Sequence, residues 1–340
     1  MSKHRVTLKQ IAEEIGVTVT TVSKALKDYP DIGKETKRKV KALAKEWNYQ
    51  PDSQAQALRN QKTFTIGLIL PEIVHFFFSN VIKGISDYAN QKGYQIIIAL
   101  SDNLTETEEK QVNLFFRNKV DGVLVSLAND TTSTEHFNQL TQFDIPVVMF
   151  DKVSESFPCS QVLIDDSYNA EVATKHLIDK GCKTVAHIRG PKGPLNSEKR
   201  FEGYVKAVQK GGLTVDEKMI KQCEHVTYEE GYVLTKELLQ SDNPPAGIFA
   251  VTDQVGAGAL EAAQELGVSV PDQLKVVGFS DSQIAKIAKP GLTTIHQPAY
   301  EIGETAARLL IDEIEQKGKP IRVRAEQTIL DCYLIERGST

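Results

Sequence analysis

Apolar residues recur at helical spacing in two short stretches near the start of the chain, residues 8–15 and 19–26. Gly16 lies between the two stretches, where it can end the first helix. Thr7 and Thr18 each precede a stretch, at the position where a hydroxyl oxygen can accept from unpaired backbone N–H groups. The pattern therefore predicts two short helices joined by a tight turn, which is the plan of a helix-turn-helix.

The outer side of the second predicted helix carries short hydroxyl side chains and one cation. These residues are Thr20, Thr21, Ser23 and Lys24. Such side chains suit a helix that lies in the major groove of DNA. The alternative is a plain antiparallel helix pair, which would carry longer charged side chains at these positions.

A third helix is predicted from about Lys34 to Trp47, with Gly33 as its N-cap. Trp47 is the only tryptophan, and we expect it in or near the core of this small domain rather than on a base-stacking surface. Pro51 ends the helix because proline lacks the backbone N–H. Residues 53–59 can form a further brief helix, but a segment this short is not stable alone in water and needs a partner.

From Thr65 onward, short apolar runs alternate with helical segments. Strands that are buried on both faces read as continuous apolar runs, and helices between them imply right-handed parallel crossovers. Two successive series of this kind predict two doubly wound lobes, with a ligand crevice at the carboxyl ends of their strands. The predicted strands are residues 65–70, 95–100, 122–127, 146–150, 184–188, 247–251 and 274–279; the predicted helices are residues 81–92, 106–118, 134–142, 169–180, 198–210, 229–240 and 255–266.

The composition is that of an ordinary globular protein, with 340 residues of which 41% are hydrophobic and 25% charged. No apolar run is long enough to span a bilayer, and the first ten residues lack the apolar core of a signal peptide. We therefore expect a cytoplasmic protein with no membrane partner. The 4 cysteines and 7 histidines show no metal-ligand spacing, so reduced thiols, no metal and no cofactor are expected.

The charge is unevenly distributed along the chain. Residues 1–62 hold 13 Lys and Arg against 7 Asp and Glu, a formal charge of +6. The remainder holds 27 against 38, a formal charge of −11. A basic head on an acidic body places the neutralisation of DNA phosphates on the head, while the body is repelled from DNA.

Motifs along nearly the whole chain resemble a single family. They are VTLKQIAEEIGVTVTTVSKAL and ETKRKVKALAKEWNYQPDSQAQALR in the head, and GLILPE, VDGVLVSL, HLIDKG, TDQVGAGAL, VVGFSD and LTTIHQP in the body. Together they closely resemble LacI/GalR-family transcriptional regulators. The resemblance implies an all-α helix-turn-helix headpiece, followed by an α/β periplasmic-binding-protein-like core of two doubly wound parallel-sheet lobes.

The resemblance also implies domain boundaries. The helix-turn-helix headpiece is residues 1–50, the hinge helix and linker 51–63, and the effector-binding and dimerisation core 64–340. Within the core, the N-lobe is expected at about 64–163 and 294–324, and the C-lobe at about 164–293 and 325–340. The helix of residues 299–316 would thus return to the first lobe.

DNA contacts are carried over from the family residue by residue. In the family the hinge becomes helical when two subunits meet on the operator, and it inserts a leucine into the minor groove. Leu58 occupies that place, and such an apolar wedge kinks DNA; the alternative is an ordinary linker in which Leu58 packs on the body. The positions that match base contacts are Val19, Thr20, Lys24, Ala55 and Leu58, and those that match phosphate contacts are Thr7, Thr18, Thr21, Ser23, Asn48 and Tyr49.

The expected effector-binding residues match family ligand positions in the crevice, most of them directly after predicted strands. They are Phe77, Phe78, Asp151, Lys152, Arg200, Asp253 and Ser280. Aromatic faces can stack on a sugar or base ring, and an arginine can grip ligand oxygens. For Arg200 the alternative is an exposed side chain at a helix start, and for Asp253 it is a helix cap.

Three departures from the family pattern leave the identity of the ligand open. His75 and Phe76 stand where relatives often have Asn-Pro, and Ser280 replaces a common aspartate. Lys152 follows Asp151 where sugar-binding relatives often have arginine, which keeps the charge but loses the planar fork.

The expected function is a sequence-specific DNA-binding regulator, of repressor type, whose affinity for a palindromic double-stranded operator is controlled by a small effector. A sugar or sugar phosphate is the expected class. Because the final residues contain no heptads that could join two dimers, a homodimer is expected. The alternatives are control by a phosphorylated carrier protein, or a sugar-binding protein without DNA function. An enzyme is not expected, since no nucleophile elbow, Walker loop or acid–base pair is found.

Overall fold

The computed structural model describes residues 6–49, 62–73, 76–316 and 325–340. The chain divides into two compact units, Met1–Thr63 and Phe64–Thr340. The first unit carries the predicted headpiece and the second the predicted core. Within the described residues, no helix is both long enough and apolar enough to cross a membrane.

The first unit contains three helices in its described part, α1 (Leu8–Ile15), α2 (Val19–Leu26) and α3 (Lys34–Glu46). Thr7 caps α1, and its hydroxyl accepts from the backbone N–H of Gln10 while the Gln10 side chain accepts from the N–H of Thr7. Thr18 caps α2 by accepting from the backbone N–H of Thr21 at 3.1 Å. Gly16 ends α1 with a φ of +75°, which is strained for any residue with a Cβ. The predicted caps and turn are confirmed.

The three helices enclose a small apolar core. It consists of Ile11, Ala12, Val22, Ala25, Val40 and Ala44. Trp47, the C-cap of α3, is partly buried against this cluster, as predicted. With so few buried side chains, this unit depends on its helix caps and on each core contact.

The second unit begins with a parallel six-stranded sheet in the order β11-β5-β4-β3-β1-β2. Its strands are β1 (Thr65–Leu70), β2 (Gln95–Leu100), β3 (Gly122–Val125), β4 (Val147–Phe150), β5 (Ser160–Ile164) and β11 (Gln327–Leu330). The accompanying helices are α5 (Phe76–Gln91), α6 (Thr105–Arg117), the 3₁₀ turn η1 (Glu135–Phe137), α7 (Asn138–Gln142) and α13 (Ala299–Gln316).

The second sheet has the order β12-β10-β9-β8-β6-β7, and only β12 runs antiparallel to its neighbour. Its strands are β6 (Val185–Arg189), β7 (Ile220–Gln222), β8 (Gly247–Ala250), β9 (Lys275–Ser280), β10 (Thr293–His296) and β12 (Tyr333–Ile335). Its helices are α8 (Asp166–Asp179), α9 (Leu195–Lys210), η2 (Glu217–Met219), α10 (Tyr228–Leu239), α11 (Asp253–Glu265) and α12 (Gln283–Ile287).

The chain crosses between the lobes three times, close to the three places that the sequence predicted to within several residues, and the third crossing departs furthest from its expected place. The first, between β5 and α8, is near residue 163 as expected. The second follows His296, within several residues of the expected position 293, because β10 pairs with β9 in the second sheet. The third lies between Leu330 and Tyr333 rather than near residue 324, because β11 pairs with β5 in the first sheet. Residues 294–296 therefore belong to the second lobe, and residues 325–330 to the first.

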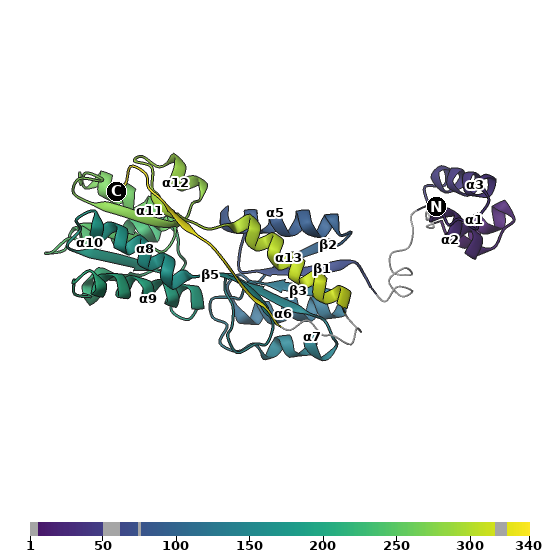
Figure 1. The fold of residues 1–340 in the computed structure, drawn as a ribbon, viewed down its shortest axis with the longest axis horizontal. Helices are drawn as coiled ribbons and strands as arrows, with labels where there is room; N and C mark the ends of the chain where they lie inside the picture. The colour runs from purple at the N-terminus through teal and green to yellow at the C-terminus, as the bar shows by residue number, and fades with distance from the viewer. Residues whose placement is uncertain (1–5, 50–61, 74–75, 317–324) are drawn as a thin grey trace. The chain divides into compact units, whose positions relative to one another are not determined.

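The first lobe is completed by a helix from near the end of the chain. Figure 1 shows α13, in yellow-green, lying beside α5 on one face of the first sheet. Two glycines allow this approach: a Cβ on Gly84 would lie 2.1 Å from the Tyr300 carbonyl oxygen, and a Cβ on Gly303 would lie 2.1 Å from that of Val81. The backbones are thus in direct contact, which fixes α13 on the first lobe.

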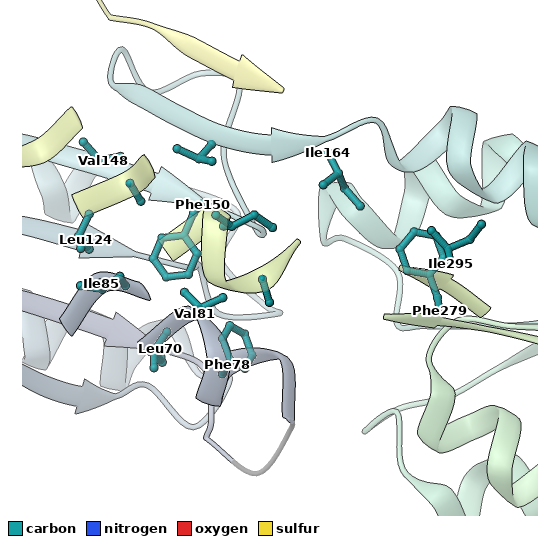
Figure 2. Packing of buried hydrophobic residues seen from close by; sticks show 14 of the residues in the cluster. Leu70, Phe78, Val81, Ile85, Leu124, Val148, Phe150, Ile164, Phe279 and Ile295 are labelled. Atoms are coloured by element: carbon teal, nitrogen blue, oxygen red, sulfur yellow. The ribbon is translucent and has the colours of Figure 1, made fainter. Parts of the chain in front are cut away.

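Each lobe has its own apolar packing against the sheet. Figure 2 shows Leu70, Phe78, Val81, Leu124 and Phe150 packed together in the first lobe, with Phe279 and Ile295 in the second. These side chains come from the strands and from the helix faces that cover them. In two packed lobes of this kind, the loops at the carboxyl ends of the strands are available to form a site between the lobes.

Candidate nucleic-acid interface and ligand pocket

The exposed face of α2 forms one side of a hollow of about 220 Å³ on the headpiece. The hollow is lined by Leu8, Val19, Thr20, Ser23, Lys24, Lys27 and Tyr29. It therefore brings together Val19, Thr20 and Lys24, the predicted base contacts in the described part of the chain. Val19 is 44% exposed, so its apolar side chain is accessible for contact at this surface.

The predicted phosphate contacts divide into helix caps and residues around the end of α3. Thr7 and Thr18 are the N-caps of α1 and α2, and the Thr18 and Thr21 hydroxyls lie 2.9 Å apart. Asn48 has a φ of +52° directly after α3, and the Tyr49 ring packs against the headpiece core. Ala55 and Leu58, the predicted minor-groove residues, lie outside the described residues, as does the predicted hinge helix.

Lys24 has a partner that the sequence did not indicate. Its Nζ donates to Asp31 Oδ2 at 2.5 Å, from the loop that joins α2 to α3. The hydrogen bond from Lys24 lowers the pKa of Asp31, which keeps this carboxylate ionised at neutral pH. The cation on the exposed face of α2 is therefore held in place by an anion.

A pocket of about 250 Å³ lies between the two lobes of the core. All seven predicted effector residues line it: Phe77, Phe78, Asp151, Lys152, Arg200, Asp253 and Ser280. The prediction that these residues meet at one place is confirmed. The lining also contains residues that the sequence did not single out, among them Glu72, Phe76, Asn103, Asn129, Asn196, His225 and Gln297.

Arg200, on α9, is buried beneath the pocket and is only 5% exposed. Its Nε donates to Asp166 Oδ1 at 2.8 Å and its Nη1 to the Val251 carbonyl oxygen at 2.9 Å. The guanidinium carbon lies 3.8 Å from the centre of the Phe279 ring. Burial raises the pKa of Asp166 to about 6, against the opposing effect of Arg200, so this carboxylate is ionised at neutral pH. The alternative of an exposed arginine is wrong.

Lys152 is held between two asparagines at the edge of the first lobe. Its Nζ donates to Asn129 Oδ1 at 2.5 Å and to Asn103 Oδ1 at 3.2 Å. Burial lowers the pKa of Lys152, and the neighbouring carboxylate of Asp151 opposes this shift. The two amides fix the ammonium group without neutralising it.

A hydrogen bond joins the two lobes across the pocket. Asn196 Nδ2, at the start of α9, donates to Asp151 Oδ1 at 3.1 Å. Asp151 directly follows β4, with a φ of +59°, and its other oxygen accepts from Ser126 Oγ at 3.3 Å. A ligand that replaces or strengthens this contact changes how the lobes meet.

Asp253 and Ser280 are tied to neighbouring segments of the second lobe. The helix cap of α11 is Thr252, whose hydroxyl accepts from the Val255 N–H, so the alternative role of Asp253 as the helix cap is wrong. Instead, Asp253 accepts from the Ser282 N–H at 2.6 Å and from Thr294 Oγ1 at 2.5 Å. Ser280 Oγ donates to Gln297 Oε1 at 2.8 Å. These bonds shape the wall of the pocket.

The aromatic side of the pocket is formed by the start of α5. Phe78 is 4% exposed and packs edge-to-face on Phe77, with ring centres 5.2 Å apart. Phe76 is 44% exposed and also lines the pocket. Phe78 therefore supports the wall from behind, and Phe76 and Phe77 present the aromatic surface.

Glu108, on α6, anchors the loop that carries Asn129. It is fully buried, and its carboxylate accepts from the Ala128 N–H at 2.7 Å, from His136 Nε2 at 2.9 Å and from Thr131 Oγ1 at 3.0 Å. This loop follows β3 and brings the Asn129 amide to Lys152. Glu108 thus sets the geometry of one pocket wall without reaching the pocket.

Replacing Glu108 by glutamine is expected to lower the free energy of unfolding by about 1–3 kcal/mol, because an amide nitrogen cannot accept one of these hydrogen bonds. Effector affinity should fall as well, since the loop of Asn129 loses its anchor. Chemical unfolding and ligand titration measure the two effects. The exposed neighbour Glu109 provides the control, and equal behaviour of Glu108→Gln and Glu109→Gln would contradict the anchoring role.

A metal site is not formed by the described ranges, in which no three His, Cys, Asp or Glu side chains gather closely enough to hold an ion. The polar groups of the pocket are amides, hydroxyls and paired charges. They can bind a polar ligand by hydrogen bonds, and the aromatic side can stack on a ring.

Two family models match the chain. Residues 7–52 match the lacI family of bacterial regulatory proteins, and residues 174–340 match a periplasmic binding protein-like domain. The ribose operon repressor of Halalkalibacterium halodurans is 35% identical over 312 residues, 92% of this chain and 91% of that protein. Catabolite control protein A of Priestia megaterium is 33% identical over 306 residues, 90% of this chain and 91% of that protein.

Solved structures agree with the sequence relatives. A complex of the transcriptional regulator CelR with cellobiose has a TM-score of 0.75 and 26% identity, over 99% of this chain and 100% of that chain. The Lac repressor dimer bound to operator and the anti-inducer ONPF has a TM-score of 0.88 over 99% of both chains, and at 22% identity it shows the fold alone. With a helix-turn-helix unit, a two-lobed core and relatives that are transcriptional regulators and not enzymes, the chain belongs to the LacI family of DNA-binding transcriptional repressors.

Proposed function

We propose that this protein is a homodimeric repressor whose affinity for a palindromic operator is controlled by an uncharged carbohydrate bound between the lobes. The observation that carries this proposal is the pocket, where all seven predicted effector residues meet amides from both lobes. A ribose operon repressor and a cellobiose-bound regulator among the similar proteins support the ligand class.

The polar groups of the pocket favour a neutral ligand over a sugar phosphate. The lining has three carboxylates, those of Glu72, Asp151 and Asp253, against the two cations of Lys152 and Arg200, and His225 is its remaining ionisable side chain. Arg200 is already paired with a carboxylate, so little positive charge remains for a phosphate. Amides offer both donors and acceptors, which is what sugar hydroxyls require.

The two cations still have hydrogen bonds to give to a ligand. In the described structure Arg200 Nη2 has no hydrogen-bond partner, and Lys152 uses two of its three N–H groups. Sugar hydroxyls can accept these remaining bonds while the rings of Phe76 and Phe77 cover an apolar face of the sugar. A cavity of about 250 Å³ suits a ligand of one or two rings.

Control of DNA affinity requires that the ligand prefer one arrangement of the lobes. The bond between Asn196 and Asp151 crosses the pocket, so a sugar hydroxyl that binds either group alters the contact between the lobes. Since the Lys152 ammonium is on the first lobe and Arg200 on the second, one ligand can engage both. Its binding energy then depends on how the lobes meet.

DNA reading is assigned to the headpiece. Val19, Thr20 and Lys24 in the α2 hollow would contact base edges, with Ala55 and Leu58 in the minor groove. Thr7, Thr18, Thr21, Ser23, Asn48 and Tyr49 would bind phosphates and fix the register. A formal charge of +6 over residues 1–62 supports this assignment.

Dimerisation is expected to use the edge of the first sheet at which the described part of the chain places no further strand. Strand β2 lies at this edge, with Ile97 42% exposed and Ile98 45% exposed. An exposed apolar edge strand is prone to aggregation unless another element packs against it. We therefore expect a second copy of the chain to pack against β2.

Ile98→Asp is expected to weaken dimerisation at least tenfold, because a carboxylate buried in an apolar interface loses its hydration. Analytical ultracentrifugation over a concentration series measures the change. Phe143→Asp provides the control, since Phe143 is 63% exposed but lies after α7, away from β2 along the sheet order. An Ile98→Asp protein that still sediments as a dimer at submicromolar concentration would rule out this face.

The function is tested by selecting bound sequences from a library of random duplexes, with and without pools of neutral sugars and of sugar phosphates. We expect a palindromic consensus whose affinity changes with one member of the neutral pool. A response to sugar phosphates alone would contradict the neutral ligand. Failure to enrich any sequence at low salt, while a sugar still binds, would contradict the assignment of operator binding.

A further inference from the structure

The loop between α2 and α3 places two carboxylates on cations of the headpiece. Asp31 Oδ2 lies 2.5 Å from Lys24 Nζ, on the exposed face of α2. Asp28 Oδ2 lies 2.5 Å from Lys41 Nζ, on α3, and the Asp28 carbonyl oxygen accepts from Lys37 Nζ at 3.1 Å. Acidic side chains beside the helix proposed to read DNA repel phosphates. Their presence is therefore not explained by a gain in affinity for DNA.

Stability does not explain the pair of Lys24 and Asp31. The side chains are 40% and 51% exposed, and exposed ion pairs contribute little to folding. Its position is informative, because Lys24 lines the α2 hollow together with Val19 and Thr20. The ammonium is also 6.0 Å from the centre of the Tyr29 ring, on the wall of the same hollow. Lys24 is thus fixed above the surface that would face base edges.

A lysine held in this way discriminates between two kinds of DNA contact. Binding to phosphates is independent of DNA sequence. Its affinity increases with each protein cation that neutralises a phosphate and so releases a counterion from the DNA. Lys24 already has Asp31 as its counterion, and the carboxylate repels a nearby phosphate. A lysine has three N–H donors, so Lys24 can donate to guanine O6 or N7 while it keeps its bond to Asp31.

We propose that Asp31 is a specificity-determining positioning residue, which fixes Lys24 for a base contact and suppresses its binding to phosphates. This inference rests on the proposed base-reading role of Lys24. It predicts that the charge of Asp31 lowers affinity for random DNA more than affinity for the operator. Asp31 therefore increases the ratio of operator affinity to affinity for random DNA.

The test compares Asp31→Asn with the wild type, as full-length proteins, on the selected operator and on a random duplex of equal length. Asparagine keeps the size of the side chain and removes its charge. We expect affinity for the random duplex to rise about tenfold and operator affinity to change by less than about threefold. The slope of log affinity against log salt on random DNA should steepen by about 1.8 for the dimer, which is about 0.9 for one added phosphate contact in each subunit.

Asp28→Asn is the matched control, because Asp28 pairs with Lys41 on α3 rather than with a residue of the hollow. It should change the two affinities by the same factor. In a Lys24→Ala background, Asp31→Asn should also change both affinities equally, since Asp31 acts through Lys24. Thermal unfolding checks that each variant is folded.

Equal changes of the two affinities in Asp31→Asn would overturn the proposal, and so would a loss of specificity that persists in the Lys24→Ala background. A different result concerns the proposed function itself: if Lys24→Ala alone leaves base preference unchanged, Lys24 does not read bases. The two failures are distinguished because the second appears without any change at Asp31.

Discussion

Replacing Arg200 by alanine is expected to lower the free energy of unfolding by about 3–5 kcal/mol at neutral pH and to abolish the response to effector. The guanidinium is the ion-pair partner of Asp166, which is 8% exposed. Its removal leaves the buried Asp166 carboxylate without its charge partner and the Val251 carbonyl oxygen without its donor, and it also removes the Nη2 donor proposed to bind the ligand. Chemical unfolding gives the stability, and operator binding with and without sugar gives the response.

The loss of stability should depend on pH with a defined sign. The pKa of Asp166 is raised to about 6 in the folded protein and is near 4 in an unfolded chain. Below pH 4 the carboxyl is protonated in both the folded and the unfolded chain, so its ionisation does not affect stability there. Between pH 4 and pH 6 the unfolded chain loses this proton more readily than the folded protein does, so stability falls as pH rises through this window. Without Arg200 the pKa of Asp166 rises further, which extends this window upward. The stability difference between Arg200→Ala and the wild type should then grow from pH 5 to pH 8.

Two further variants make the result specific to the charge and its position. Arg200→Lys keeps the charge but cannot reach both Asp166 and the Val251 carbonyl oxygen with one planar group, so it should recover only part of the stability. Arg308→Ala removes an arginine that is 44% exposed and should cost less than about 1 kcal/mol. A loss for Arg200→Ala that does not change between pH 5 and pH 8 would contradict the ion-pair explanation.

The sequence predicted best those elements whose signals are local. Thr7, Gly16 and Thr18 fix the ends of α1 and α2 through bonds to residues within a few positions. The apolar runs of β1, β3, β4 and β9 are buried on both faces and therefore read clearly. Neither feature depends on where the distant parts of the chain lie.

Elements that depend on distant partners were misplaced or missed. Strand β11 has alternating partly buried and exposed residues, and its membership of the first sheet comes from pairing with β5, for example Gln327 with Gln161. Strand β10 contains two threonines and pairs with β9 in the second sheet. No pattern within such short strands indicates which of two sheets will accept them, and for this reason the third lobe crossing lies later than predicted.

The pocket residues divide in the same way, into those that a local sequence signal indicates and those whose role depends on a distant partner. Asn103 and Asn129 each follow a predicted strand closely, as most of the predicted residues do, and they could have been found by applying that criterion to every predicted strand, whereas Gln297 follows β10, which was not predicted. Asn196 could not, because it begins a helix and its role comes from Asp151 in the other lobe. The bond between Asp253 and Thr294 could not be predicted either, because the two residues are 41 positions apart.

Replacing Lys24 by alanine is expected to reduce operator affinity by about 1–3 kcal/mol for each half-site, and so by about twice that for a dimer on a two-fold operator. The physical reason is the loss of a base contact that discriminates one base pair from the others. Lys24 lies in the α2 hollow with its ammonium fixed, so little is lost in ordering this side chain on binding. Binding to duplexes in which one symmetric pair of bases is varied measures the effect.

The operator and random duplexes separate two consequences of this substitution. Without Lys24, the Asp31 carboxylate loses its counterion and repels all DNA, which lowers both affinities by the same factor. The additional loss on the operator is the base contact, and it should vanish on duplexes changed at that base pair. Lys27→Ala is the control, because Lys27 lines the hollow next to α2 without a predicted base contact and should weaken both duplexes alike. If Lys24→Ala behaves as Lys27→Ala does, the cation on α2 binds phosphate and base reading is left to Val19 and Thr20.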